Sequence, residues 1–208
     1  MKLTAILIGL AAMAASLPAT TILFGGGGGV DLGVSSQAFG PVIATGYASN
    51  GVFQDLYGKG VAGTGSEDGL GLVGDFTGDG EIYAKFATGA PAGDFIQLSI
   101  AGLNGPIFIS MGSTGGDGWA VYGNNTAGTL VGASSALASF SGPGNDDGSE
   151  VIVTNATSYK YLDIVATSNN VLLQDLVYTS SVPEPGTLGI VGLGGVLIGL
   201  LRRKLRQN

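Results

Sequence analysis

The chain contains 208 residues, of which 39 are Gly, and it contains neither Cys nor His. Without Cys no disulfide framework can form, and without both residue types neither a Ser-His-Asp nor a Cys-His catalytic relay can be built. The usual Cys and His ligands of zinc and haem are missing for the same reason. The length corresponds to one domain of ordinary size with short appendages.

The net charge is -7, and it is unevenly distributed. Residues 3–201 contain three Lys and fifteen acidic residues, which gives this part of the chain a net charge of -12. The remaining basic residues lie at the two ends, where they flank two apolar runs, and this pattern is typical of segments that a membrane handles. An acidic body repels phosphate backbones, so we expect no nucleic-acid partner.

Residues 1–19 predict a helical signal peptide. A charged start at Met1-Lys2 precedes an apolar core at residues 3–15, and small residues with candidate cleavage sites follow between Ala14 and Ala19. The apolar core has the length of a signal segment and is short for a membrane span. A buried N-terminal helix is the alternative interpretation.

The last part of the chain, residues 182–207, has three components. Pro183-Glu184-Pro185 disfavours helix and sheet and so predicts an extended, accessible junction. An apolar run follows at residues 187–201, which as a helix covers about 22 Å of a roughly 30 Å hydrocarbon core. Because basic side chains can reach the interface, we predict a transmembrane helix here. The cytoplasmic topology signal consists of Arg202, Arg203, Lys204 and Arg206.

This tail resembles the PEP-CTERM sorting signal of Gram-negative bacteria. The resemblance rests on Pro183-Glu184-Pro185, on the Gly- and Leu-rich membrane segment, and on Arg202-Arg203-Lys204. It implies recognition by an exosortase, a membrane-embedded cysteine transpeptidase-like enzyme. The enzyme would process an inner-membrane intermediate near the Pro-Glu-Pro motif and deliver the body to the cell surface or extracellular matrix. The resemblance also implies an association with exopolysaccharide and biofilm. A plain C-terminal membrane anchor is the alternative.

Between these signals, residues 30–181 predict an all-β domain, an antiparallel β-sandwich of jelly-roll-like type. Short apolar runs are separated by Gly, Asn, Asp and Ser clusters, and Ile96, Leu98 and Ile100 share one face of an expected strand. We expect roughly eight to ten strands. The last two should be joined by a hairpin-type connection across residues 168–170. Residues 20–29, with five consecutive glycines, are assigned to a Gly-rich linker.

An acidic turn at residues 75–81 resembles the opening of a calcium-binding loop, with Gly80 at the sixth position. Position 12 is Phe86 instead of a bidentate Glu, and no helices are expected beside the loop, which argues against an EF-hand. The sequence leaves open a calcium ion held by a sandwich loop or a solvated acidic turn. The candidate oxygen ligands are Asp75, Thr77, Asp79 and Glu81. No other cofactor is indicated.

Trp119 and Tyr122 are the candidate sugar contacts, since aromatic faces flanked by Asn and Asp are typical of carbohydrate-binding sandwiches. Their spacing points them to opposite faces of a strand, which favours a core position for one and a surface position for the other. Paired carboxylates are the only acid–base groups available for a glycan-active enzyme. They lie in Gly- and Asp-rich turns, so we expect no enzyme activity.

These features together predict an exported, exosortase-sorted protein of the cell surface or extracellular matrix with a non-enzymatic sandwich domain. The expected partners are the processing enzyme, the membrane and exopolysaccharide. The alternative function is a carbohydrate-binding β-sandwich module, with or without a structural calcium ion.

Overall fold

The computed structural model describes residues 19–25, 28–60, 68–74, 80–84, 86–87, 90–91, 93–112, 117–130, 135–140 and 149–179. Within these ranges the regular elements are β-strands, apart from one 3₁₀ turn, η1 (Ala156–Ser158). None of the helices in this part of the chain is long and apolar enough to cross a membrane. The predicted signal helix and the predicted transmembrane helix at residues 187–201 lie outside the described residues, except for Ala19.

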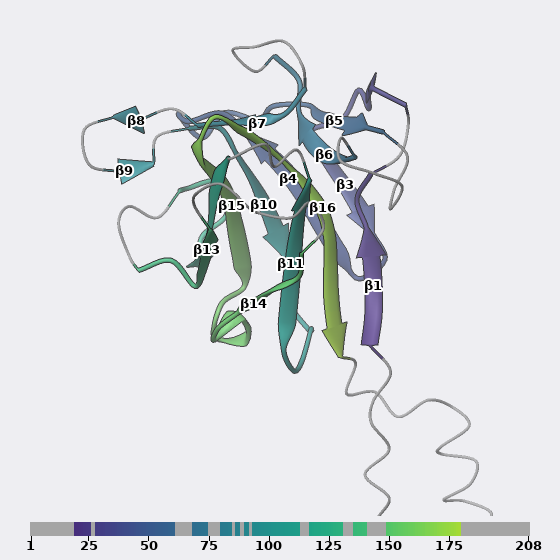
Figure 1. Cartoon of the computed structure of the whole chain (residues 1–208), viewed down its shortest axis with the longest axis vertical. Helices are drawn as coiled ribbons and strands as arrows, with labels where there is room; N and C mark the ends of the chain where they lie inside the picture. The colour runs from purple at the N-terminus through teal and green to yellow at the C-terminus, as the bar shows by residue number, and fades with distance from the viewer. Residues whose placement is uncertain are drawn as a thin grey trace, which may run out of the picture. The chain divides into compact units, whose positions relative to one another are not determined.

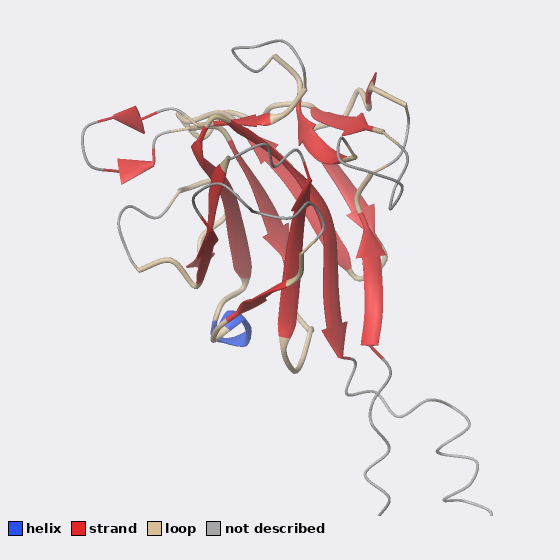
Figure 2. Cartoon of the chain, in the orientation of Figure 1, coloured by secondary structure: helices blue, strands red, loops and turns tan. Residues whose placement is uncertain are grey.

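Two antiparallel sheets form the body of the molecule (Figures 1 and 2). The first, eight-stranded sheet follows the order β14-β11-β16-β6-β5-β2, and β1 and β7 also pair with β16. Its strands are β1 (Ala19–Leu23), β2 (Val30–Asp31), β5 (Leu56–Lys59), β6 (Gly69–Leu72), β7 (Ile82–Tyr83), β11 (Ile107–Gly112), β14 (Val151–Val153) and β16 (Asn170–Thr179).

The second, six-stranded sheet follows the order β13-β12-β15-β10-β4-β3. Its strands are β3 (Ser36–Phe39), β4 (Val42–Tyr47), β10 (Phe95–Ser99), β12 (Gly118–Asn124), β13 (Ala138–Phe140) and β15 (Tyr161–Ser168). A separate pair joins β8 (Phe86–Ala87) to β9 (Ala90–Pro91). The all-β, antiparallel sandwich predicted from the sequence is therefore confirmed.

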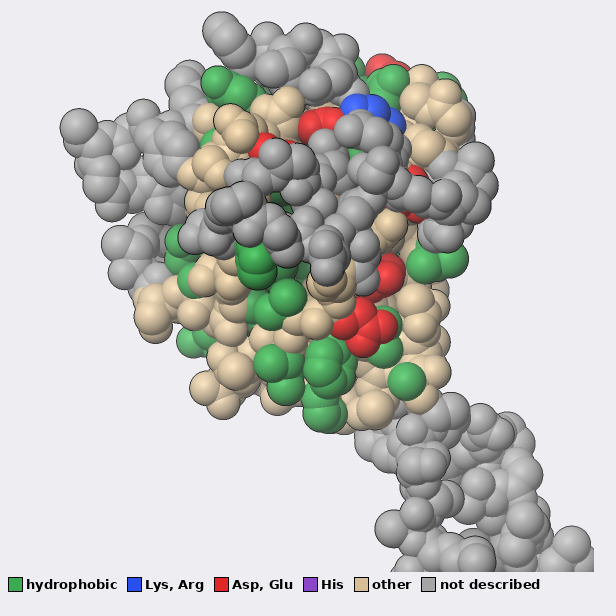
Figure 3. Space-filling view, in the orientation of Figure 1, with side chains coloured by type: hydrophobic (Ala, Val, Ile, Leu, Met, Phe, Trp, Pro, Cys, Tyr) green, Lys and Arg blue, Asp and Glu red, His purple; other side chains and the backbone are tan. Residues whose placement is uncertain are grey.

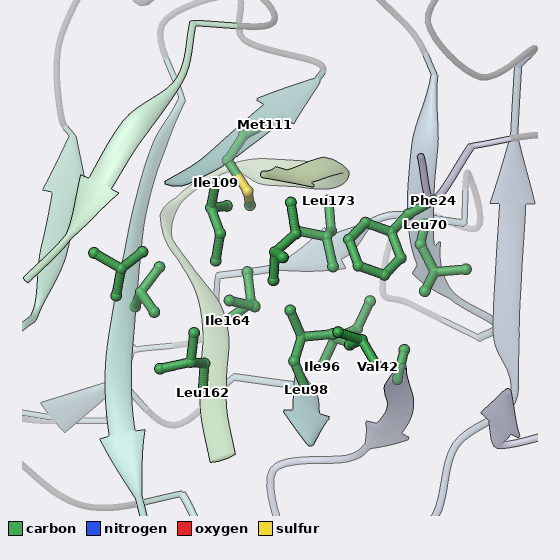
Figure 4. Packing of buried hydrophobic residues seen from close by; sticks show 14 of the residues in the cluster. Phe24, Val42, Leu70, Ile96, Leu98, Ile109, Met111, Leu162, Ile164 and Leu173 are labelled. Atoms are coloured by element: carbon green, nitrogen blue, oxygen red, sulfur yellow. The ribbon is translucent and has the colours of Figure 1, made fainter. Parts of the chain in front are cut away.

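The inner faces of the two sheets share one apolar core. Alternation places Ile96 and Leu98 of β10 and Leu162 and Ile164 of β15 inward, and none of the four is exposed. Figure 4 shows side chains from both sheets meeting in this space. The labelled residues are Phe24, Val42, Leu70, Ile96, Leu98, Ile109, Met111, Leu162, Ile164 and Leu173.

One glycine is required by the close approach of two chain segments in the eight-stranded sheet. A Cβ atom added at Gly71 would collide with the backbone carbonyl oxygen of Gly80. Any side chain at Gly71 would therefore push the segment that carries Glu81 and β7 away from β6.

The segment assigned to a linker, residues 20–29, contains a strand that the sequence analysis did not predict. β1 pairs with the last strand from Ala19, opposite Thr179, to Leu23, opposite Asp175. Phe24, which is 1% exposed, then packs edge-on against Phe39 at 5.0 Å between ring centroids. The Thr-Thr-Ile sequence before the glycines supplies β-branched residues that favour a strand. The compact unit accordingly extends from Ala19 to Val182.

The connection between the last two strands is not the hairpin that the sequence analysis expected. β15 belongs to the six-stranded sheet and β16 to the eight-stranded sheet, so the chain passes from one sheet to the other at Asn169. Asn169 has a φ of 50°, and Asn tolerates this left-handed conformation better than most residues. The single residue thus turns the chain between the two layers.

Candidate functional site

The predicted sorting residues follow the last strand almost directly. Pro183, Glu184, Pro185 and the four basic residues Arg202, Arg203, Lys204 and Arg206 lie outside the described residues. β16 ends at Thr179, only four residues before Pro183. β16 is also the best-connected strand of its sheet, since it pairs with β1, β6, β7 and β11. The tail therefore begins just after a strand that pairs with four others.

The candidate calcium loop lies largely outside the described residues, because Asp75, Thr77 and Asp79 are among those not described. Glu81 is described and is 3% exposed, and its Oε1 lies 2.5 Å from the Nζ of Lys59. This buried ion pair links β5 to the start of β7. Among the described residues no group of three Asp or Glu side chains could hold a metal ion. Calcium binding by this loop stays a prediction.

The candidate sugar residues lie on opposite faces of β12. Trp119 is 1% exposed and packs in the inter-sheet core, with Ala166 and Phe140 as its partners in register. Its indole N–H has no hydrogen-bond partner among the described residues. Tyr122 is half-buried on the outer face of the six-stranded sheet. The two rings cannot form one platform, and the buried face of Trp119 is not offered to a sugar.

A buried polar network lies on this outer face, and the sequence analysis did not identify it. Asp163 of β15 is fully buried. Its Oδ1 accepts a hydrogen bond from Nε2 of Gln97 at 2.7 Å, and its Oδ2 accepts one from Nδ2 of Asn124 at 2.9 Å. Gln97 and Asp163 are direct cross-strand partners. Both carboxylate oxygens therefore receive amide donors, which offset the cost of burying the charge.

The same amides hold the loop that follows β12, residues 125–130, against the sheet. Asn124 accepts a hydrogen bond from the backbone N–H of Thr126 at 2.9 Å and donates to the carbonyl of Thr129. Gln97 accepts one from the N–H of Gly128 at 3.1 Å. The loop thus covers the buried carboxylate, and this network has the character of a structural element.

Three aromatic rings stack beside this network. Tyr47 lies between Phe95, at 5.1 Å between ring centroids, and Phe53, at 5.2 Å. Phe95 is fully buried, whereas Phe53 is 65% exposed. Burial raises the pKa of the Tyr47 hydroxyl, with smaller contributions from Tyr161 and from the charge of Asp163. The stack anchors the turn that follows β4 to the outer face of the six-stranded sheet.

A second polar cluster lies on the outer face of the eight-stranded sheet, at a bulge in β16. The register between β11 and β16 shifts after Ser110, which is opposite Asp175, so Gln174 is the extra residue. Gln174 donates from Nε2 to Oδ1 of Asp68 at 2.6 Å, and it accepts a hydrogen bond of 3.5 Å from the Ser110 hydroxyl. The bulge therefore places an amide, a hydroxyl and two carboxylates close together.

Asp175 is the least compensated group of this cluster. Its Oδ1 is buried and has no hydrogen-bond partner among the described residues. Burial raises the pKa of the Asp175 carboxyl, a hydrogen bond from Ser110 lowers it, and the charges of Glu150 and Asp68 raise it further. A carboxyl in this position is protonated more readily than an ordinary Asp carboxyl. The only sequence signal for the cluster is the adjacent polar pair Gln174-Asp175, which interrupts the apolar pattern of β16.

The described part of the chain is thus a β-sandwich whose last strand leads directly into a C-terminal tail. The family model of the PEP-CTERM protein-sorting motif matches residues 181–206. The chain therefore carries this sorting motif, as the sequence analysis predicted, and Pro183-Glu184-Pro185 lies within the match. The motif indicates an exported, exosortase-processed protein of Gram-negative bacteria. No curated protein and no solved structure matches the chain.

Proposed function

We propose that this protein is a non-enzymatic component of the cell surface or extracellular matrix, delivered there by an exosortase that processes its C-terminal tail. The observation that carries the proposal is the match of residues 181–206 to the PEP-CTERM protein-sorting motif. In this proposal the signal helix predicted within residues 1–19 is cleaved off before the body, whose first strand begins at Ala19. Residues 187–201 form a transient transmembrane helix in the inner-membrane intermediate.

A structural role for the sandwich is supported by the partners of its buried carboxylates. Asp163 receives two amide donors, Glu81 pairs with Lys59, and Asp68 accepts a hydrogen bond from Gln174. Such interactions fix strands and loops in place. A catalytic acid or base requires contact with a substrate, and these carboxylates instead contact groups of the protein itself.

The surroundings that we propose for the mature body are those of an exopolysaccharide-rich biofilm. This setting is implied by the resemblance of the tail to the PEP-CTERM signal. This setting is compatible with the composition of the body. The body is acidic and contains no Cys and no His, so its folding requires neither disulfide formation nor a metal ion bound by those residue types.

The intact mass of the mature protein tests this proposal. The full chain is expressed in a host that contains an exosortase and in the same host with the exosortase gene deleted. We expect the mature body from the first host to have lost the residues beyond the Pro-Glu-Pro motif, and the product from the second host to retain them. A matched variant, Pro183→Ala with Glu184→Ala and Pro185→Ala, should retain the tail in both hosts. A mature mass that still includes residues 187–208 in the presence of the enzyme would contradict the proposal.

A further inference from the structure

The start and the end of the β-sandwich lie side by side. β1 begins at Ala19, and its cross-strand partner is Thr179, the last residue of β16. The two strands are antiparallel, so one enters and the other leaves the body at the same end of the sheet, the lower end in Figure 1. Both segments that the sequence analysis assigns to the membrane therefore connect to one end of the body.

We call this end the terminal pole and define it by Ala19, Thr179 and three connections: residues 40–41, 101–106 and 154–160. The strand registers place these connections together. Ile107, the first residue of β11, pairs with Tyr178, which precedes Thr179 in β16. Tyr161, the first residue of β15, is opposite both Ser99 and Asn124. A Cβ atom at Gly105 would contact the Thr179 hydroxyl, so the 101–106 loop lies directly beside the end of β16.

The terminal pole differs from the rest of the body in its charge. Its three connections contain no acidic residue, and Lys160 is the charged side chain that they expose. Within the described ranges, acidic side chains at the opposite strand ends include Asp31, Asp55, Asp94 and Asp117. Figure 3 shows described acidic side chains of one face in its upper part and again in its lower half, but not at the lower edge of the body. A protein with a strongly acidic body thus has a neutral to weakly basic surface where its tail begins.

The terminal pole is close to the sorting motif along the chain. Three residues lie between Thr179 and Pro183, and the four Cα-to-Cα steps from one to the other span at most about 14 Å. An enzyme that binds the Pro-Glu-Pro region must come within this distance of the terminal pole as long as β16 stays in its sheet. We propose that the terminal pole is the surface of the body that contacts the membrane-embedded processing enzyme. This inference rests on the proposed function.

Charge and side-chain size fit such a contact. The connections of the terminal pole bring no carboxylate to this contact, so the enzyme can approach without the cost of desolvating an acidic side chain. The exposed residues of the 101–106 loop are small or neutral, which allows a close approach. New acidic side chains at the terminal pole should therefore slow processing, although they lie outside the sorting motif.

The test compares two triple variants of the full chain that add the same charge. The pole variant carries Ala101→Glu, Asn104→Glu and Thr157→Glu, all at exposed positions of the terminal pole. The control variant carries Val30→Glu, Val34→Glu and Val52→Glu, also exposed but outside the pole. Both are expressed with the exosortase, and pulse-chase labelling measures the rate at which the tail is removed. The melting temperature of each body shows that the variants are folded.

We expect the pole variant to be processed at least several-fold more slowly than the wild type and the control variant at close to the wild-type rate. Insertion of twelve Gly and Ser residues between Thr179 and Pro183 should restore the rate of the pole variant, because the enzyme then no longer has to approach the body. Equal rates for the two triple variants would overturn the inference.

Two other results separate this inference from its alternatives. If the wild-type tail is not removed, the proposed function fails and the inference fails with it. The isolated product of processing can also be mixed with vesicles that contain anionic lipid. Two results together would show that the terminal pole contacts lipid and not the enzyme. The first is that the product binds the vesicles and the pole variant does not. The second is that the inserted linker fails to restore the processing rate of the pole variant, and this outcome would overturn the assignment of the partner.

Discussion

The carboxylates on the outer faces of the two sheets differ in how fully they are hydrogen-bonded. On the six-stranded sheet, both oxygens of Asp163 accept hydrogen bonds from the amides of Gln97 and Asn124. On the eight-stranded sheet, Asp175 has one buried oxygen without a partner among the described residues, and two further carboxylates, Asp68 and Glu150, lie near enough to raise its pKa. The charge of Asp163 is therefore compensated by hydrogen bonds, whereas the charge of Asp175 is not compensated to the same degree.

The difference teaches that donor count, and not burial alone, decides the role of an acidic side chain in this fold. Asp163 is the more deeply buried of the two, yet its two amide donors also hold the loop at residues 125–130. Asp175 lies at a bulge, where the donors nearby are a hydroxyl and an amide that already binds Asp68. The negative charge of Asp163 is compensated by amide donors, whereas that of Asp175 lies close to the charges of other carboxylates.

The largest expected effect is on the stability of the six-stranded sheet. Asp163→Ala leaves the amides of Gln97 and Asn124 buried without their acceptor, so the free energy of unfolding should fall by roughly 3–5 kcal/mol. Asp163→Asn, which keeps one acceptor oxygen, should lose less than Asp163→Ala and stays measurable if the alanine variant does not fold. Urea denaturation of the body measures both values.

The control for this prediction is Asp94→Ala. The carboxylate of Asp94 accepts one exposed hydrogen bond, from the backbone N–H of Ser49 at 3.0 Å. Its removal should cost no more than about 1 kcal/mol. A loss for Asp163→Ala as small as that for Asp94→Ala would show that the network on the six-stranded sheet is not a stabilising element.

A smaller effect of the opposite sign is expected at Asp175. Because its pKa is raised in the folded state, the protonated form stabilises the fold. This contribution is fully present below the ordinary pKa of an Asp and is lost as the pH rises through the raised value. Asp175→Asn removes the repulsion from Asp68 and Glu150, so at neutral pH the free energy of unfolding should rise by roughly 0.5–1 kcal/mol.

Thermal denaturation over a series of pH values checks this second prediction. The wild type should lose stability relative to Asp175→Asn as the pH rises through the titration of Asp175, and the two proteins should be closest in acid. Gln174→Leu offers a comparison, because it removes the amide that binds Asp68 and should destabilise the same bulge. A destabilised Asp175→Asn at neutral pH would mean that the charge of Asp175 is compensated after all.

The sequence predicted the layers of this fold better than the roles of individual side chains. Alternation in β10 correctly placed Ile96 and Leu98 in the core, because period-two patterning reports which face of a strand is apolar. It could not show that the opposite face is also covered. Gln97 and Asp163 have the pattern of solvent-facing residues, and only the three-dimensional position of the loop at residues 125–130 makes them buried.

Two further differences have local physical causes. The strand at Ala19–Leu23 escaped prediction because its partner, Thr179, lies at the other end of the chain, and five glycines immediately after it dominated the local composition. The i, i+3 spacing of Trp119 and Tyr122 indicated opposite faces, and the structure places Trp119 in the core. The sorting motif was predictable because it is a linear signal that requires no tertiary structure.

The smallest expected effect concerns Tyr47, which senses the charge of Asp163. Burial raises the pKa of the Tyr47 hydroxyl, and the charges of Tyr161 and Asp163 add to the rise, so the neutral phenol stabilises the fold. This contribution is present below the ordinary tyrosine pKa of about 10 and is lost as the pH rises through the raised value. Tyr47→Phe should leave stability at neutral pH within about 0.5 kcal/mol of the wild type, because the ring can still stack on Phe95 and Phe53.

Ultraviolet titration of the phenolate, together with denaturation at alkaline pH, measures this effect. Tyr47→Phe should reduce the loss of stability above pH of about 10. In Asp163→Asn the pKa of Tyr47 should move back toward its ordinary value, because the neutral amide no longer disfavours the phenolate. An unchanged Tyr47 titration in folded Asp163→Asn would mean that the amides of Gln97 and Asn124 already screen the Asp163 charge. The compensation on the six-stranded sheet would then be more complete than the structure indicates.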